Sequence, residues 1–166
     1  MRFVDLVCSG LEAWRTVKKE GWDERAYSDE LKVHLIRSLH QAAVSRSVVL
    51  PNGRIDLRLL PNGGVERDEG TSIVVRSSRR VAPEVVLIEV KRNLTRAVAF
   101  QRLVDDQIPK YCEDLSDIGR LVVVLIGRTS PKFLKELRRI EEGSRRNDRW
   151  ARNSRQIRII EKPFAS

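Results

Sequence analysis

This 166-residue sequence has little cysteine and no long apolar run. Its two cysteines, Cys8 and Cys112, are too few and too far apart for a zinc site or an iron–sulfur cluster, and we expect free thiols. No segment approaches the roughly 20 apolar residues that a membrane span needs. The first residues lack the long apolar region of a signal peptide, so we expect a cytoplasmic protein with no membrane partner. The chain also lacks a glycine loop for phosphate binding and a helicase motif.

Positive charge is abundant. The chain has 32 basic and 23 acidic residues, a formal net charge of +9, and 24 of the basic residues are arginine. Arginine binds phosphate through two hydrogen bonds from one planar group, so the balance favours a polyanionic partner over an acidic protein or a neutral ligand. A GC-rich genome or a thermophilic habit would give a similar composition. The arginines that we expect to contact nucleic acid are Arg54, Arg58, Arg92, Arg145, Arg146 and Arg149.

Apolar periodicity and turn residues predict one domain over 1–166, of the α/β class, with a mixed sheet flanked by helices. The first predicted elements are a helix over 1–22, a helix from an N-cap at Ser28 to about Ala43, strands 44–50 and 54–60 joined by a turn at Asn52-Gly53, and a surface excursion over 61–83. They are followed by a strand over 84–91, a helix from about Thr95 that Pro109 kinks or restarts, a strand over 121–126, a helix from Ser130-Pro131 to about Gly143 and a last strand over 156–161.

The strand over 84–91 is the unusual element, because its apolar sequence ends with an acid and a base. Side chains alternate along a strand, so Glu89 and Lys91 share one face with Val85 and Leu87, whereas Val86, Ile88 and Val90 share the other. Burying either charge without a partner would cost several kcal/mol, roughly. Another polar group must therefore share the face of Glu89.

Asp56 is the candidate for that group. It lies in the strand over 54–60, between Arg54 and Arg58, and it would lie beside Glu89 if the two strands are neighbours. A divalent cation is the ordinary way to bring two carboxylates together, and oxygen ligands favour magnesium or manganese. A metal held by two acids beside a lysine suits phosphodiester hydrolysis. The alternative is structural, with Glu89 paired to Lys91 and Asp56 paired to a neighbouring arginine.

Together these residues resemble the PD-(D/E)xK nuclease superfamily, which has the restriction-endonuclease-like fold. The resemblance rests on Asp56 in Gly53-Arg54-Ile55-Asp56, on Glu89-Val90-Lys91 at the end of an apolar strand, and on Gln107 with Tyr111, which match the Q-x-x-x-Y pattern of RecB-like members. The element order over about 28–127 resembles the αβββαβ core of the superfamily, which includes Holliday-junction-resolvase-like members. Residues 1–27 would be a helical lead-in, and 128–166 a basic helix and terminal strand.

The resemblance implies a Mg²⁺-dependent (or Mn²⁺-dependent) deoxyribonuclease. Asp56, Glu89 and the Val90 carbonyl would bind the metal, and Lys91 would orient the attacking water. DNA would be the substrate, with selectivity for structures such as junctions, flaps or ends. A homodimer or a larger DNA-processing assembly is the expected quaternary context.

Two supporting residues follow from the same resemblance. Glu30 would be the additional acid that many members carry on the first core helix. Gln107 would support the site from the next helix, with Gln101 as its substitute because Pro109 disturbs the helix.

Two other functions stay open at this point. The same fold can serve as a DNA-binding or assembly module with little or no turnover, which the arginine content favours and the complete triad disfavours. A protein-assembly subunit with incidental positive charge is the more remote alternative. Salt-sensitive DNA binding without metal-dependent cutting would indicate the first of these.

Overall fold

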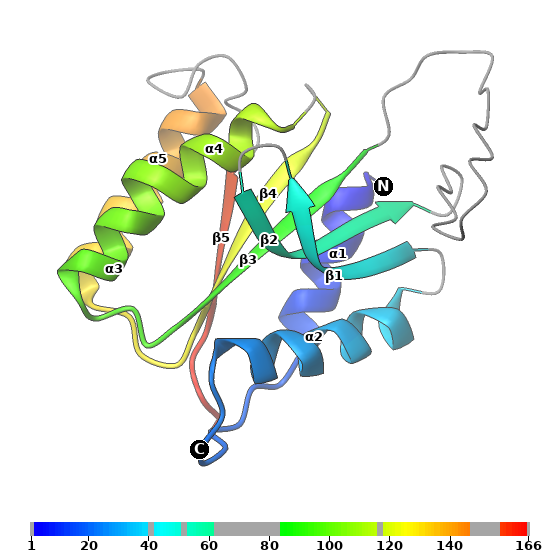
Figure 1. Cartoon of the computed structure of the whole chain (residues 1–166), viewed down its shortest axis with the longest axis horizontal. Coiled ribbons are helices and arrows are strands. Elements are labelled where there is room, and N and C mark those ends of the chain that lie inside the picture. Colours follow the sequence, from blue (N-terminus) through cyan, green and yellow to red (C-terminus); the bar gives the residue numbers. More distant parts are fainter. Residues whose placement is uncertain are drawn as a thin grey trace.

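The computed structural model describes residues 2–39, 42–50, 53–61, 84–115, 118–146 and 157–165, without the side chains of 43, 46, 47 and 144–146. Over this part the chain is α/β, with a mixed five-stranded sheet in the order β1-β2-β3-β4-β5 and helices on both faces (Figure 1). The elements are α1 (Phe3–Ala13), α2 (Glu24–Ser38), β1 (Ala42–Leu50), β2 (Gly53–Pro61), β3 (Val86–Arg92), α3 (Ala97–Gln101), the π-helical η2 (Arg102–Gln107), α4 (Ile108–Glu113), β4 (Arg120–Ile126), α5 (Pro131–Arg146) and β5 (Ile157–Lys162).

The sheet combines two kinds of pairing. β1, β2 and β3 form an antiparallel meander, as the Asn52-Gly53 turn signal predicts. β3, β4 and β5 are parallel to one another, so helices must carry the chain back between them. α3, η2 and α4 connect β3 to β4, and α5 connects β4 to β5. The carboxyl ends of the three parallel strands therefore lie at the same edge of the sheet.

Each face of the sheet has its own hydrophobic core. α1 and α2 cover one face, and α3, α4 and α5 cover the other (Figure 1). The alternation predicted along β3 is confirmed, because Val86, Ile88 and Val90 pack against α1 and α2, whereas Leu87 belongs to the opposite core. Burying each such side chain contributes about 1.5–3 kcal/mol, so β3 is firmly held in the centre of the sheet.

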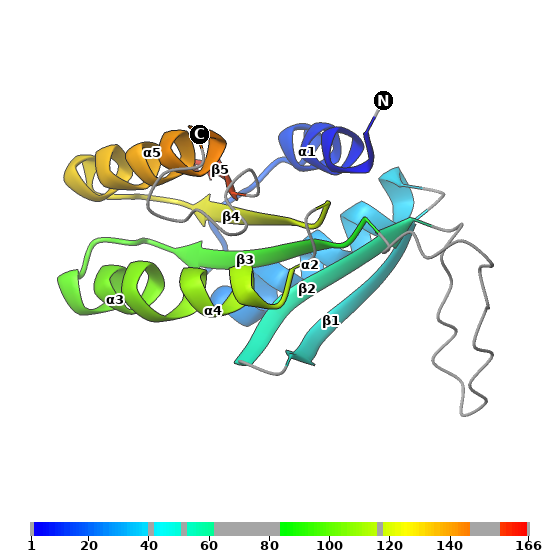
Figure 2. The same ribbon diagram turned by 90° about the horizontal axis from the view of Figure 1, so that it is seen from above.

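β2 departs from its predicted alternation. Leu57 and Leu59 pack toward α1 and α2, but Ile55, which regular strand alternation would place on the same face, lies in the core of α3, α4 and α5. The switch coincides with the end of the β2–β3 ladder, which runs only from Leu59–Val86 to Leu57–Ile88. Beyond this point the two strands separate (Figure 2). The backbone pairing of β2 with β3 thus ends on the β2 side of Glu89.

The first two helices begin and end at residues other than those predicted. α1 ends at Ala13 instead of near Gly21. α2 begins at Glu24 because Asp23 is its N-cap, with Asp23 Oδ1 accepting a hydrogen bond from the Ala26 N–H at 2.9 Å. Ser28, the predicted N-cap, lies inside the helix and donates to the Glu24 carbonyl at 2.9 Å. α2 ends at Ser38, and Ala42 and Ala43, predicted to lie in this helix, belong to β1.

The helix is predicted to kink or restart at Pro109, and the structure shows a restart: α3 passes into the π-helical η2, and a new helix, α4, begins at Ile108. The Ile108 N–H bonds to the Leu103 carbonyl, so the turn before Pro109 is a wide π-helical turn. Pro109 then lies in the first turn of α4, where its missing backbone N–H breaks no helical hydrogen bond. This geometry keeps Gln107 and Tyr111 on the side of the helix that faces the sheet. α5 likewise continues past Gly143, to Arg146.

Some predictions fall outside the described residues, namely the surface excursion over 62–83 and Arg149. Within the described ranges, no helix has both the length and the apolar character needed to cross a membrane.

Candidate active site

A cluster of four charged side chains lies where β2 and β3 separate. Asp56 comes from β2, Glu89 and Lys91 from β3, and Glu24 from the first turn of α2. Glu89 is only 3% exposed, and its Oε1 lies 2.6 Å from Lys91 Nζ. Burial lowers the pKa of Lys91, but the attraction of Glu89, Glu24 and Asp56 outweighs it and the pKa is raised. Lys91 is therefore a stable ammonium that supplies counter-charge to the acids.

The Asp56 side chain makes a hydrogen bond to the backbone of β3 at the point where the β2–β3 backbone ladder has ended. Its Oδ2 accepts a hydrogen bond from the Val90 N–H at 2.7 Å. Burial raises the pKa of Asp56, although the Val90 hydrogen bond and the Lys91 charge lower it. Asp56 lies near enough to Glu89 for its negative charge to raise the pKa of Glu89, as expected if the two strands are neighbours. Val90 contributes its N–H here, and its carbonyl as a metal ligand stays a prediction.

Glu89 is the most perturbed acid of the cluster. Burial raises its pKa to about 7, the Asp56 and Glu24 charges add to the rise, and Lys91 opposes it. Within the described part of the chain its second oxygen, Oε2, has no hydrogen-bond partner. A buried carboxylate with one unused oxygen is costly for folding alone, which favours a functional reason for its presence.

Gln107 and Tyr111 support the cluster from η2 and α4. Gln107 Nε2 donates to Glu89 Oε1 at 3.2 Å, so Oε1 is held from two sides. The Tyr111 hydroxyl donates to the Arg54 carbonyl at 2.7 Å and ties α4 to β2. Burial and the nearby charges of Glu89 and Asp56 raise the pKa of Tyr111, which keeps the hydroxyl protonated as a donor. Both members of the Q-x-x-x-Y pattern thus act on the gap between β2 and β3.

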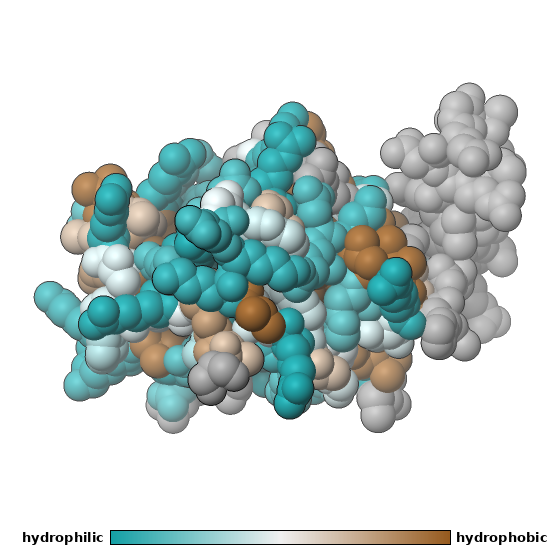
Figure 3. All heavy atoms as spheres, turned by 90° about the horizontal axis from the view of Figure 1, so that it is seen from below, coloured by the Kyte–Doolittle hydropathy of each residue, from teal (hydrophilic) through white to brown (hydrophobic). Residues whose placement is uncertain are grey.

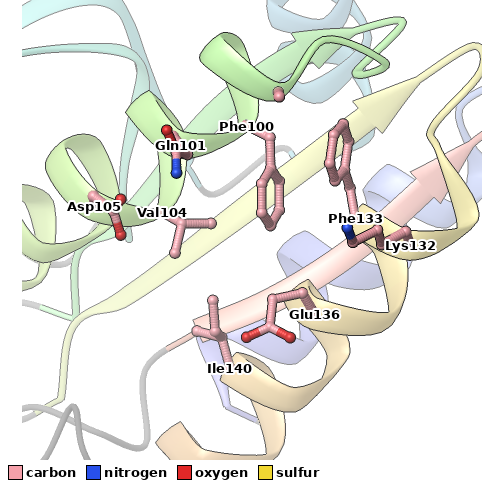
Figure 4. A pocket seen from close by; sticks show the side chains of 9 residues that line it. Phe100, Gln101, Val104, Asp105, Lys132, Phe133, Glu136 and Ile140 are labelled. Atoms are coloured by element: carbon pink, nitrogen blue, oxygen red, sulfur yellow. The ribbon is translucent and has the colours of Figure 1, made fainter.

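Gln101, the alternative to Gln107, lies elsewhere. It lines a separate hollow of about 470 Å³ between α3 and α5 (Figure 4). Two stacked rings, Phe100 and Phe133, stand in this hollow with their centroids 4.3 Å apart. Gln107 is therefore the glutamine that contacts the acid cluster.

Glu30 is not part of the cluster, contrary to the expectation from the resemblance. It accepts a hydrogen bond from Trp14 Nε1 at 3.3 Å and is ion-paired with Lys19. Glu24 takes the predicted place, because α2 begins earlier than expected and its first turn lies against the end of β3. Glu24 Oε2 lies 4.0 Å from Lys91 Nζ, and the Glu24 carboxylate accepts a hydrogen bond from the Arg92 backbone N–H.

Burial raises the pKa of Glu24, and the Lys91 charge opposes the rise. The sequence signal for Glu24 was the N-cap residue Asp23. Read as a cap, it places the next residue in the first turn of α2.

The predicted nucleic-acid contacts are only partly described. Arg54 is exposed next to the site, at the start of β2. Arg58 and Arg92 are half-buried, and Nε of each lacks a hydrogen-bond partner among the described residues. The side chains of Arg145 and Arg146 lie outside the described part, as does the whole of Arg149.

The cluster offers hard oxygen ligands, yet the acids are not arranged as a ready-made metal cage. Among the described residues, no three histidine, cysteine, aspartate or glutamate side chains are close enough together to hold a metal ion. What fits a cation is the pair of Asp56 and Glu89, with partnerless oxygens at Glu89 Oε2 and Glu24 Oε2. Carboxylate oxygens of this kind suit magnesium or manganese, which keep several water ligands and need few from the protein.

Comparison of this chain with protein-family models, with curated proteins and with solved structures finds no match.

Proposed function

We propose that this protein is a Mg²⁺-dependent (or Mn²⁺-dependent) deoxyribonuclease with a restriction-endonuclease-like core. One observation carries the proposal. A deeply buried glutamate, Glu89, keeps one oxygen free beside a second carboxylate, Asp56, and is tied to Lys91 at the carboxyl end of a central strand. Perturbed acids in an opening of a sheet are typical of catalytic sites.

Asp56 and Glu89 would hold the cation, and Glu24 is the nearest further acid. A bound divalent cation would polarise the scissile phosphate and lower the pKa of the attacking water. The chain itself fixes both carboxylates beforehand, Asp56 through the Val90 N–H and Glu89 through Gln107. Fixed ligands lower the entropic cost of assembling the site when substrate arrives.

Lys91 would contribute charge at the reacting phosphate. Its raised pKa keeps it protonated, so it acts as a hydrogen-bond donor and a positive charge, and it does not act as a general base. Its side chain is 16% exposed, so the ammonium is within reach of a ligand that enters the gap. There it would orient the attacking water and stabilise the negative charge that develops in the transition state.

DNA is the substrate that the charge favours. The chain has a net charge of +9, and Arg54, Arg58 and Arg92 lie on the strands that carry the acids. On the face that Figure 3 shows, hydrophilic side chains predominate among the described residues, and hydrophobic ones form small separate patches. A hydrophilic surface on a chain with positive net charge suits contacts with the phosphate backbone.

The second candidate is a DNA-binding or assembly module on the same fold. One observation favours it, because no three ligating side chains are grouped for a metal in the described ranges. In that case Lys91 is simply the permanent partner of the acids, and the chain binds DNA without cutting it.

Cleavage of plasmid and linear DNA in Mg²⁺ and in chelator separates the two. The proposal predicts cleavage in Mg²⁺, none in chelator, and a loss of cleavage in Asp56→Asn. The matched control is Asp106→Asn, which removes the same charge from a 48%-exposed residue paired with Lys110 and should cleave as wild type does. Cleavage that survives chelator or Asp56→Asn contradicts the proposal, and salt-sensitive binding without cleavage supports the second candidate.

A further inference from the structure

Three aromatic rings and two cations form a surface cluster beside the acid site. We call it the Trp22 cluster, and it comprises Trp22, Tyr27, Phe164, Lys19 and Arg92. The rings of Trp22 and Tyr27 are in edge contact with centroids 5.2 Å apart, and those of Tyr27 and Phe164 are 5.8 Å apart. Tyr27 is fully buried, whereas Trp22 and Phe164 are half-buried. The cluster therefore presents two partly exposed aromatic side chains, Trp22 and Phe164, that contact the buried ring of Tyr27.

The cations of the Trp22 cluster lie on its rings. Lys19 Nζ is 4.0 Å from the Trp22 ring centroid, and the Arg92 guanidinium carbon is 6.0 Å from the Tyr27 centroid. Since the rings already carry cations, the cluster does not suit a cationic ligand. It suits a ligand with a flat aromatic part and negative charge, because the rings can stack and the cations can pair with phosphate.

The Trp22 cluster adjoins the acid site through two short chain connections. Trp22 is separated only by Asp23 from Glu24, whose Oε2 lies 4.0 Å from Lys91 Nζ. Arg92 directly follows Lys91, and its backbone N–H donates to Glu24. A strand that places one phosphate at Glu89 and Lys91 would therefore have its neighbouring nucleotide within reach of Trp22 and Arg92.

Arg92 has unused capacity for such a ligand. Its Nε is buried and has no hydrogen-bond partner within the described residues. Lys19, in contrast, is paired with Glu30 and is 41% exposed, so its flexible side chain can leave the Trp22 ring for a phosphate at small cost.

We propose that the Trp22 cluster binds an unpaired nucleotide of the substrate, its base stacked on Trp22 and its phosphate held by Arg92. The ligand is thus single-stranded DNA, or a duplex with a single-stranded end, because a paired base in a duplex cannot expose its face to a side chain. This inference rests on the proposed nuclease function for the placing of the scissile phosphate, but the stacking itself needs neither metal nor turnover.

The test is equilibrium binding in chelator, so that cleavage plays no part. Fluorescein-labelled (dT)12 and a blunt hairpin duplex are titrated with wild type, Trp22→Leu, Trp22→Phe and Arg92→Gln. Loss of one base–aromatic stack weakens binding about tenfold. We expect that loss for (dT)12 with Trp22→Leu, little loss with Trp22→Phe, and duplex binding close to wild type for both.

Two controls match the substitutions. Val98→Ala shortens an 81%-exposed apolar side chain on α3, and Arg139→Gln removes a charge from a 69%-exposed arginine on α5. Arg92→Gln should weaken (dT)12 binding more than Arg139→Gln does, and Val98→Ala should leave it unchanged. If Trp22→Leu proves unfolded by thermal melting, the comparison of Arg92→Gln with Arg139→Gln still decides the question.

The outcomes separate this inference from the proposed function. Trp22-dependent binding of (dT)12 without Mg²⁺-dependent cleavage supports the inference and contradicts the nuclease. Cleavage by a wild-type protein that binds (dT)12 no better than the hairpin, or whose Arg92→Gln variant binds (dT)12 as tightly as Arg139→Gln, overturns the inference and leaves the nuclease intact.

Discussion

Two buried glutamates lie against the same sheet, and their surroundings differ in an instructive way. Glu141, on α5, is 7% exposed; its Oε2 accepts the Ile159 N–H at 2.6 Å and its Oε1 lies 3.5 Å from Arg138. Arg138 in turn donates to the Ile159 carbonyl at 2.8 Å. Glu89 is 3% exposed, but its Oε2 has no partner among the described residues and its neighbours include two further acids.

The difference indicates which buried charge has a structural role and which is the better candidate for a functional one. β5 is at the end of the sheet, so its outer backbone groups need partners, and Glu141 and Arg138 supply them. Glu89 satisfies no backbone group, and the strands around it have separated. A buried carboxylate that keeps an oxygen without a partner among the described residues and lies beside two further acids is the one to test for chemistry.

The largest expected effect is on cleavage. Glu89→Gln should lower the rate of Mg²⁺-dependent DNA cleavage by about 100- to 1000-fold, because it removes a metal-binding charge while keeping the shape of the side chain. Glu141→Gln makes the same change in the other buried glutamate and should leave the rate of the folded enzyme close to wild type. Initial rates on linear DNA measure both variants. Equal losses of cleavage in the two variants would contradict a functional difference between Glu89 and Glu141.

The next effect is on stability. Glu141→Ala should lower the free energy of unfolding by about 2–3 kcal/mol, because it leaves the Ile159 N–H and Arg138 without their carboxylate. Urea denaturation followed by circular dichroism measures the change. A loss within the error of the wild-type value would mean that the β5 edge does not depend on Glu141.

A smaller effect separates the two glutamines. Gln107→Ala should reduce cleavage about 10- to 100-fold, since Glu89 Oε1 loses one of its two donors and keeps only Lys91. Gln101→Ala truncates the same residue type earlier in the helix, in the hollow between α3 and α5, and should cleave normally. Equal cleavage rates for the two variants would show that Gln107 does not support the site.

The smallest effect has a defined pH dependence. Glu89 has its pKa raised from 4.5 to about 7 in the fold, so its carboxylate destabilises the protein increasingly as the pH rises between these values. In chelator, Glu89→Gln should therefore be about 1–2 kcal/mol more stable than wild type at pH 8, and the gain should vanish below about pH 4.5. Denaturant melts at both pH values check this, and a gain independent of pH would show another cause.

Much of this arrangement can be predicted from sequence, because it depends on local patterns. The apolar alternation of β3 fixes the face of Glu89 and Lys91, and the turn at Asn52-Gly53 predicts that β1 pairs with β2, the strand that carries Asp56. These strand features follow from a period of two residues, which survives folding unchanged. Gln107, in contrast, is indicated by the resemblance of Gln107 and Tyr111 to the Q-x-x-x-Y pattern.

The remaining features depend on competition between local signals or on tertiary packing. Asp23 and Ser28 are both acceptable N-caps, and only the structure shows that Asp23 is the one used. The acid of α2 that lies beside Lys91 is then Glu24 and not Glu30. The change of face between Ile55 and Leu57 arises where β2 leaves β3, which no periodicity reports. The π-helical turn before Pro109 likewise reflects packing of the helix on the sheet.

The central prediction is that Asp56 and Glu89 bind one divalent cation where β2 and β3 separate. A crystal grown with Mn²⁺ and measured at the manganese absorption edge tests it most directly. The account predicts an anomalous peak about 2.1–2.2 Å from oxygens of both carboxylates. A well-ordered site with no peak between them, or with Lys91 filling that position while manganese binds elsewhere, would contradict it.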